Sequence, residues 1–281
     1  MKVLVTSSTG TVGSRVVEKL RTQSDVEVYQ ATRKPSMAGQ VHFDLSSEPS
    51  LEKALVGMDK LVLITPASTS ETEDSLRVVR CAQKVGVRHI VFMSIHQVDR
   101  APHIPHFASK IEIQKELVRS GLPWTTIAPN NFYQNDYWFK ESLLDHGIYP
   151  QPYGHVGLSR VDADDIATAL ANAVKREDLV GQIFPLVGPE ALTVQDVCDT
   201  YARHLKKDIL YGGDDLKRWF DFNKQFLPEW LLMDWLQMYE FFQAQGLRAS
   251  ALDYIQQEKI LGHPPKQFET FVKETVQLWK K

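Results

Sequence analysis

The stretch Lys2-Val-Leu-Val-Thr-Ser-Ser-Thr-Gly-Thr-Val-Gly13 decides the fold of this chain. An apolar run that predicts a strand leads into a loop of small residues containing Gly10 and Gly13, and a helix is expected from Ser14 to about Leu20. Because glycine has no Cβ, a phosphate can approach this backbone closely, and the helix start offers free N–H groups and a positive dipole end. The loop is therefore expected to hold the pyrophosphate of a dinucleotide; a purely structural turn is the alternative. The expected contacts are Ser7, Ser8, Thr9, Gly10, Thr11, Val12 and Gly13.

The second predicted strand, residues 26–31, discriminates between the two nicotinamide cofactors. NAD requires a carboxylate at the end of this strand to hold the ribose 2′-hydroxyl. Arg33 and Lys34 stand there instead, and a guanidinium can bind a 2′-phosphate with two hydrogen bonds. We expect NADP(H), with a solvated surface pair as the alternative interpretation.

Composition sets the class of protein. With 281 residues, 43% hydrophobic content and 24% charged residues, the chain is long enough for one large domain or a domain with a smaller lobe. A net charge of −3 gives no indication of a nucleic-acid or membrane partner. Two distant cysteines, no CxxC pair and a strand that begins at Lys2 favour a cytoplasmic protein without disulfides or a signal peptide.

Strands and helices alternate through the first half of the chain. Predicted strands at 40–45, 60–65, 89–94 and 124–128 are separated by predicted helices at 50–55, 70–85 and 109–120. This alternation is typical of an α/β fold with a doubly wound parallel sheet, whose ligands bind at the carboxyl ends of the strands. Asp44, at the end of the third strand, is expected either to accept a hydrogen bond from the adenine amino group or to cap the following turn.

The regular alternation of predicted strands and helices ends after about residue 136. A helix at 164–175, a strand at 183–187 and a helix at 194–205 follow a more irregular segment. We therefore expect a cofactor-binding domain over 1–135, to which segments around 155–190 return, and a lobe over 136–281 that is mostly a substrate or lid region. Asp162, Asp164 and Asp165 are interpreted as helix caps or dipole partners.

Residues 219–242 are unusually rich in aromatic side chains. A helix between Pro228 and Gly246 has almost no polar face and is predicted to be covered nearly all round. Core packing or a homodimer contact is one interpretation, and a wall over a flat, apolar ligand is the other. The side chains expected to contact such a ligand are Trp219, Trp230 and Trp235.

Several segments in a fixed order resemble the NmrA-like family of the atypical short-chain dehydrogenase/reductase superfamily. They are Val3–Gly13, Thr65-Pro66, His89–Ser94, Ser109-Lys110, Ser120–Ile127, Asn131–Asn135, Val161–Ala167, Leu186–Glu190 and Leu261–Pro265. The resemblance spans nearly the whole chain and implies a Rossmann domain with a small α+β C-terminal substrate lobe, and NADP(H) as cofactor. The residues assigned to the cofactor, besides the loop and the basic pair, are Asp44, Leu45, Thr65, Pro66, Ser94, Lys110, Asn131 and Phe132.

Two departures from the family pattern bear on the chemistry. The family usually has glycine at the position of Ser7, so here the turn must form with a Cβ present. The superfamily's Tyr-x-x-x-Lys is replaced by His106-Phe-Ala-Ser-Lys110, so the usual proton donor is missing. This loss points away from simple ketones and toward acceptors that take hydride with little acid help.

The remaining candidates for catalysis are Lys110, His106 and Tyr133. Lys110 is expected to bind the nicotinamide ribose, with an exposed lysine at the helix start as the alternative. His106 and Tyr133 are alternative proton donors, and an ordinary loop histidine is the other interpretation of His106. His96, Tyr133 and Asn135 are expected near the substrate. A metal site from His96, His103 and His106 has no supporting ligand spacing, and none is predicted.

Two functions follow. The first is an NADPH-dependent reductase that acts on a small, flat, conjugated molecule such as a quinone, an imine or iminium ion, or a dye. The second is a non-catalytic NADP(H)-sensing protein that binds a protein partner, since a fold alone does not determine function.

Overall fold

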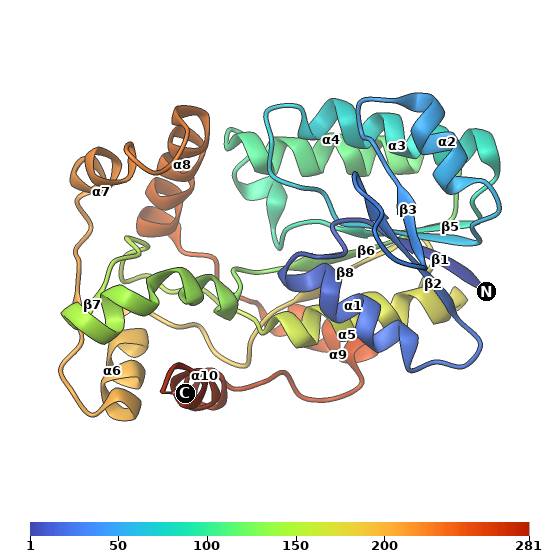
Figure 1. Ribbon diagram of the computed structural model, residues 1–281. Coiled ribbons are helices and arrows are strands. Elements are labelled where there is room, and N and C mark those ends of the chain that lie inside the picture. The colour runs from blue at the N-terminus through green and yellow to red at the C-terminus, as the bar shows by residue number, and fades with distance from the viewer. Residues whose placement is uncertain (281) are drawn as a thin grey trace. The chain divides into compact units, whose positions relative to one another are not determined.

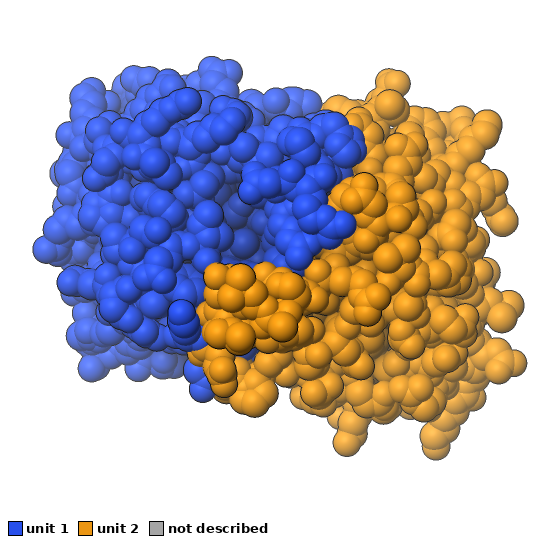
Figure 2. All heavy atoms as spheres, turned by 180° about the vertical axis from the view of Figure 1, so that it is seen from behind, with its two compact units in different colours: residues 1–129, 163–185, 259–262 blue, residues 130–162, 186–258, 263–281 orange. Residues whose placement is uncertain are grey.

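The computed structural model describes residues 1–280, which divide into two compact units. The first contains residues 1–129, 163–185 and 259–262, and the second contains residues 130–162, 186–258 and 263–281; Figure 2 gives each its own colour. The segment 163–185 thus returns to the unit that holds the N-terminus. The two units are described separately.

The first unit is built on a seven-stranded sheet with the strand order β3-β2-β1-β4-β5-β6-β8. The strands are β1 (Lys2–Val5), β2 (Glu27–Thr32), β3 (Gln40–His42), β4 (Lys60–Leu63), β5 (His89–Met93), β6 (Trp124–Pro129) and β8 (Gln182–Leu186). The registered pairs from β3 across to β6 are all parallel. The order reverses between β1 and β4, and such a switch point is where open α/β sheets bind ligands. The predicted doubly wound parallel sheet is confirmed.

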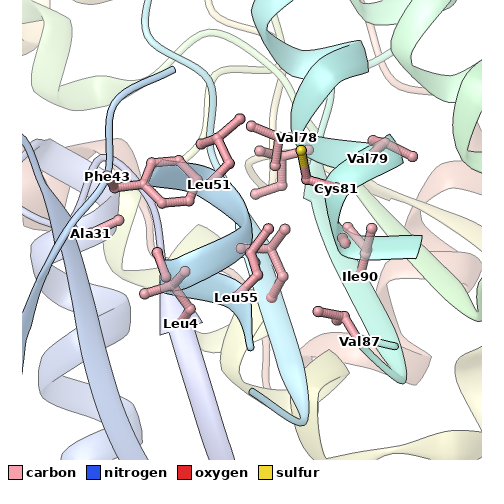
Figure 3. Packing of buried hydrophobic residues seen from close by; sticks show 14 of the residues in the cluster. Leu4, Ala31, Phe43, Leu51, Leu55, Val78, Val79, Cys81, Val87 and Ile90 are labelled. Atoms are coloured by element: carbon pink, nitrogen blue, oxygen red, sulfur yellow. The ribbon is translucent and has the colours of Figure 1, made fainter. Parts of the chain in front are cut away.

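Helices cover both faces of this sheet (Figure 1). One face carries α1 (Thr11–Arg21) and α5 (Ala163–Lys175), which pack against each other. The other carries α2 (Glu48–Leu55), α3 (Glu71–Val85) and α4 (Pro105–Ser120), packed in succession. In Figure 3, Leu4 and Ile90 of the strands meet Leu51 and Leu55 of α2 and Val78 of α3 in a fully buried cluster. Continuous apolar strands covered on both sides explain why β1, β4 and β5 were recognisable in the sequence.

One helix begins earlier than predicted. The sequence predicts a start at Ser109, but α4 starts at Pro105, which takes the first helical position. Proline is favoured there because its missing N–H has no intrahelical partner in any case. His106 was therefore wrongly placed in a loop: it lies in the first turn of α4, four residues before Lys110 and on the same helix face.

The second unit is mainly helical, with a two-stranded parallel sheet. Its strands are β7 (Ile148–Tyr149) and β9 (Leu210–Tyr211), and its helices are α6 (Val194–Leu205), α7 (Leu216–Asn223), α8 (Glu229–Gln245) and α10 (Phe268–Trp279). Helix α9 (Ala251–Leu261) has residues in both units. A 3-10 segment, η2 (Tyr133–Phe139), follows the segment 130–132.

Helix α8 is less covered than its sequence predicts. Pro228 and Gly246 flank it as expected, and Leu232, Tyr239 and Phe242 are buried. Trp230 and Met233, however, are 38% and 44% exposed. The N-terminal half of α8 therefore presents apolar side chains at the surface of this unit, and the prediction of nearly complete coverage was wrong.

Both cysteines are buried. Cys81 is 4% exposed on α3 and Cys198 is 1% exposed on α6, and neither forms a disulfide. Burial raises the pKa of the Cys81 thiol, and it raises the pKa of Cys198 to about 12. Within residues 1–280, no helix combines the length and apolarity that a membrane crossing requires.

Candidate functional site: a dinucleotide loop and two polar clusters

The loop after β1 is shaped by Ser7 and Gly13. Ser7 has a φ of +47°, a left-handed conformation that glycine adopts more easily, and its hydroxyl donates to the Ile64 carbonyl at 2.8 Å. A Cβ on Gly13 would lie 2.2 Å from the Ser7 carbonyl oxygen, so only glycine fits there. Ser8 is tied to the next strand, since its hydroxyl donates to the Ala31 carbonyl at 3.2 Å. The loop is held in one shape although serine replaces the family's glycine.

The start of α1 is open to an anion. Its N-cap residue, Gly10, provides no side-chain cap, and the first turn of α1 contains no acidic residue. By contrast, Ser47 caps α2, and Thr193 and Asp196 form a capping box on α6. The first N–H groups of any helix lack intrahelical partners, so α1 offers donors and a positive dipole end that a phosphate can satisfy. The loop and helix start thus fit the pyrophosphate of a dinucleotide.

The basic pair follows β2 as predicted. Arg33 and Lys34 are exposed, and neither side chain forms an ion pair with a residue in the range 1–280. The Asp44 carboxylate accepts hydrogen bonds from the Ser46 hydroxyl and N–H, at 2.7 and 3.0 Å, and these bonds lower its pKa. Asp44 therefore caps its own turn, which was one of its two expected roles. The Leu45 carbonyl is occupied by Arg77, at 2.6 Å.

Lys110 lies in a buried polar cluster with Glu71 and Thr65. Its Nζ is 2.6 Å from Glu71 Oε1, and the two side chains are 8% and 5% exposed. Thr65 accepts a hydrogen bond from Lys110 and donates one to Glu71 at 2.5 Å. Glu71 begins α3, whose dipole favours a carboxylate there. The ammonium group also lies 5.7 Å from the centre of the Phe92 ring.

The alternative of an exposed lysine at the helix start is wrong, and the expected contact of Lys110 with the nicotinamide ribose stays a prediction. The pair is neutral overall, and Lys110 has at most one ammonium hydrogen left for a ligand. Glu71 was missed because its partner is 39 residues away in the sequence. The available signal was its place in the first turn of a helix that begins at the carboxyl edge of a parallel sheet.

Other predicted residues of the first unit lie after the same strands. Ser94 and His96 follow β5 and are buried, and their N–H groups donate to the carbonyls of Ile127 and Pro129. His106 is half-buried and packs edge-on against Phe107. Pro66 is exposed. Within residues 1–280, no group of three or more potential metal ligands is found.

In the second unit, the predicted residues fall in the segment 131–135. Asn131, Phe132 and Asn135 are half-buried, whereas Tyr133 is completely enclosed. The Tyr133 hydroxyl donates to the Lys266 carbonyl at 3.2 Å, and its ring packs on Phe268 and Phe271. This environment favours a packing role, and its role as proton donor stays a prediction.

The three predicted tryptophans also belong to the second unit. Trp219 packs edge-on against Tyr239 at 5.0 Å, and Trp235 against Trp138 at 6.2 Å. Trp138 is 72% exposed and was not predicted. We call Trp138, Trp230, Met233 and Trp235 the aromatic surface of the second unit.

A buried ion pair in the second unit had no signal in the sequence. Arg160 and Asp136 are both inaccessible to solvent, with Nη2 and Oδ1 2.8 Å apart. Burial alone would lower the pKa of Arg160, but Asp136, Tyr149 and Tyr153 together raise that pKa above its usual value. Gly188 passes so close that a Cβ would lie 1.9 Å from the Arg160 carbonyl oxygen.

Comparison with known proteins agrees with this architecture. The chain is 26% identical over 286 residues to an NAD(P)H azoreductase of Xenophilus azovorans, with 96% of both proteins covered. An NADPH-dependent quinone oxidoreductase from Escherichia coli, solved with NADPH, superposes with a TM-score of 0.87 over 99% of this chain and 100% of that one, at 22% identity. The negative transcriptional regulator NmrA, solved with NADP, superposes with a TM-score of 0.79 at 15% identity, covering 99% and 95%.

The model of the NmrA-like family matches residues 1–260, which is most of the chain. Relatives at about this level of similarity include NAD(P)H-dependent reductases, and the solved structures include both a reductase and a regulator. Together with the parallel sheet and the open start of α1, this match shows that the chain belongs to the NmrA-like family.

Proposed function

We propose that the protein is an NADPH-dependent reductase that transfers hydride to a small, flat, conjugated acceptor such as a quinone, an imine or iminium ion, or an azo or related dye. The observation that carries the proposal is the α1 start, which has neither a side-chain cap nor an acid, together with Arg33 and Lys34 after β2, which form no ion pair within residues 1–280. These groups suit the pyrophosphate and 2′-phosphate of NADP(H). The azoreductase similarity supports the acceptor class.

NADPH, when bound, supplies the hydride, and the protein binds and orients the cofactor and polarises the acceptor. The hydride brings two electrons to the acceptor; a neutral acceptor such as a quinone, an imine or an azo dye also takes one proton from solvent, whereas an iminium ion takes none. We assign Lys110 to the nicotinamide ribose, with Glu71 and Thr65 fixing its ammonium group. A neutral Lys110–Glu71 pair provides orientation without a strong net field, which suits acceptors that need little acid help.

The test follows nicotinamide oxidation. Purified protein is mixed with NADPH and a panel of quinones, iminium ions and azo dyes, and absorbance at the nicotinamide band is recorded. We expect turnover with at least one class and little turnover with simple ketones. No turnover on any acceptor, combined with tight NADP⁺ binding, would overturn the reductase proposal.

The second candidate is a non-catalytic NADP(H) sensor that binds a protein partner. The aromatic surface favours it, because exposed Trp138, Trp230 and Met233 are the kind of side chains that protein interfaces bury. The same assay separates the two, since a sensor binds NADP⁺ and NADPH without consuming either.

A further inference from the structure

The segment 130–133 of the second unit is fixed almost completely by hydrogen bonds. The Asn131 N–H donates to Asn130 Oδ1 at 2.8 Å, and the Asn131 carbonyl accepts from the Val161 N–H at 2.9 Å. The Phe132 carbonyl accepts from Arg160 Nη2 at 2.9 Å. Backbone and side chain are therefore anchored at successive residues.

Arg160 determines which way the Asn131 carboxamide faces. Arg160 Nε donates to Asn131 Oδ1 at 3.0 Å. A guanidinium has donors only, so the amide oxygen must face it and the NH₂ group must face away. Flipping the amide would set NH₂ against N–H and leave a buried donor unpaired.

Arg160 itself has little freedom. It is fully buried, it forms two hydrogen bonds to Asp136 at 2.8 and 3.2 Å, and its guanidinium lies 5.5 Å from the centre of the Phe268 ring. Asp136 is held in turn by the hydroxyls of Tyr149 and Tyr201, at 2.8 and 3.1 Å. The orientation of Asn131 is thus imposed by a rigid network.

The Asn131 NH₂ group donates to none of the residues in the range 1–280, although its other three polar groups are all bonded. Asn131 is half-buried, so its two N–H donors remain accessible. We infer that Arg160 is a positioning residue that holds the Asn131 carboxamide with its NH₂ group ready to donate to an oxygen or nitrogen of the bound ligand. That acceptor atom belongs either to the carboxamide of nicotinamide or to the reducible substrate. The inference rests on the proposed function, and it supplies a fixed donor in a chain without the superfamily's tyrosine.

Three variants test the inference. Asn131→Asp keeps an oxygen facing Arg160, exchanges the NH₂ group for an acceptor oxygen and adds a negative charge beside the guanidinium. Arg160→Lys keeps a cation beside Asp136 but removes the donors to Asn131 and Phe132. Tyr254→Phe is the matched control, because it removes one hydrogen bond elsewhere in the second unit, to the Pro189 carbonyl, and leaves the bonds of Asn131, Arg160 and Asp136 in place.

The measurements are the melting temperature, the dissociation constant of NADPH, and kcat and KM for a quinone. We expect Asn131→Asp to lower either the affinity for NADPH or kcat about 100-fold, as is typical when a hydrogen-bond donor to developing charge is removed. Arg160→Lys should have an effect of about the same size. A loss confined to the dissociation constant assigns the donor to nicotinamide, and a loss confined to kcat assigns it to the substrate. Tyr254→Phe should change neither the dissociation constant of NADPH nor kcat.

A direct readout is the ¹⁵N-resolved signal of the Asn131 NH₂ group, identified by its absence in Asn131→Asp. It should shift when NADP⁺, or NADP⁺ with a quinone analogue, is added, and the shift should be lost in Arg160→Lys. The inference is overturned if Asn131→Asp and Arg160→Lys keep wild-type constants and the signal does not respond. Failure of the reductase proposal is distinguishable, because the wild type would then bind NADP⁺ without turnover while the NH₂ signal still reports on the donor.

Discussion

Ser7 combines a positive φ with a hydrogen bond that compensates for it. Substituting Ser7→Ala keeps the left-handed backbone and removes the bond to Ile64, so we expect a loss of about 1 kcal/mol in the free energy of unfolding. Ser7→Gly also removes the bond but relieves the backbone, and it should stay within about 0.5 kcal/mol of wild type. Urea unfolding of both variants measures the difference. An equal loss in the two would show that the backbone at Ser7 is not strained.

The Lys110–Glu71 pair predicts a compensating double substitution. Lys110→Met leaves a buried carboxylate without its cation, which should cost about 3–5 kcal/mol. Adding Glu71→Gln removes that charge and should restore most of the stability, while turnover stays low because the ribose contact is gone. Unfolding and NADPH oxidation are measured on the single and double variants. Full activity in the double variant would contradict the role of Lys110.

The buried His89 should make the free energy of unfolding depend on pH. Its Nε2 lies 3.0 Å from Thr125 Oγ1, and Nδ1 has no partner among residues 1–280. Burial, with a smaller effect from Lys60, lowers the pKa of His89 to about 4 from the 6.5 of an unfolded chain. Between pH 6.5 and about pH 4, the unfolded state therefore binds a proton at His89 and the folded state does not. The contribution of neutral His89 to the free energy of unfolding is fully present above pH 6.5. As the pH falls from there to about pH 4, the free energy of unfolding should fall by about 1.4 kcal/mol per pH unit.

The control is His89→Gln, which keeps a donor for Thr125 and does not titrate in this range. Urea unfolding of both proteins at several pH values isolates the histidine as the difference between the two curves. If the curves run parallel between pH 6.5 and 4, His89 is not the group responsible.

At the scale of elements, two substitutions on α8 distinguish a side chain that contacts the ligand from one that only packs in the core. Trp230→Ala changes an exposed side chain of α8, so it should change the free energy of unfolding by less than about 1 kcal/mol while raising KM for a flat acceptor. Leu232→Ala, two residues away and 1% exposed, should cost about 2–5 kcal/mol. Unfolding and steady-state kinetics are measured on both. An unchanged KM in Trp230→Ala would remove this surface from the substrate site.

How far the sequence predicts an element depends on how local its determinants are. Strands β1, β4 and β5 were predicted because each has an apolar run of its own. Both ends of α6 were predicted, and Thr193 and Asp196 form a capping box at its start. The start of α4 was missed because Pro105 suits both a loop and a first helical turn. Glu71 and Arg160 depend on partners brought near by the fold, which no local pattern encodes.

At the scale of the whole molecule, the preference for one cofactor should be measurable as a larger rise in the protein's melting temperature. A ligand that binds only the folded protein adds about 2.7 kcal/mol at a hundredfold excess over its dissociation constant. We expect NADP⁺ to raise the melting temperature more than equal NAD⁺, and Arg33→Ala to remove most of that difference. Lys53→Ala, which removes an exposed cation from α2, is the control and should preserve it. Equal shifts for both cofactors in the wild type would contradict the NADP(H) preference.

The two cysteines give this chain a chemical tolerance that suits the acceptors proposed for it. Quinones are electrophiles that alkylate thiolates as well as accept hydride. Thiolates form only when a thiol can ionise and be reached, and Cys81 and Cys198 are enclosed with raised pKa values. A quinone that meets the folded protein therefore finds no accessible thiolate to arylate, and we expect repeated exposure to such compounds to leave both cysteines unmodified.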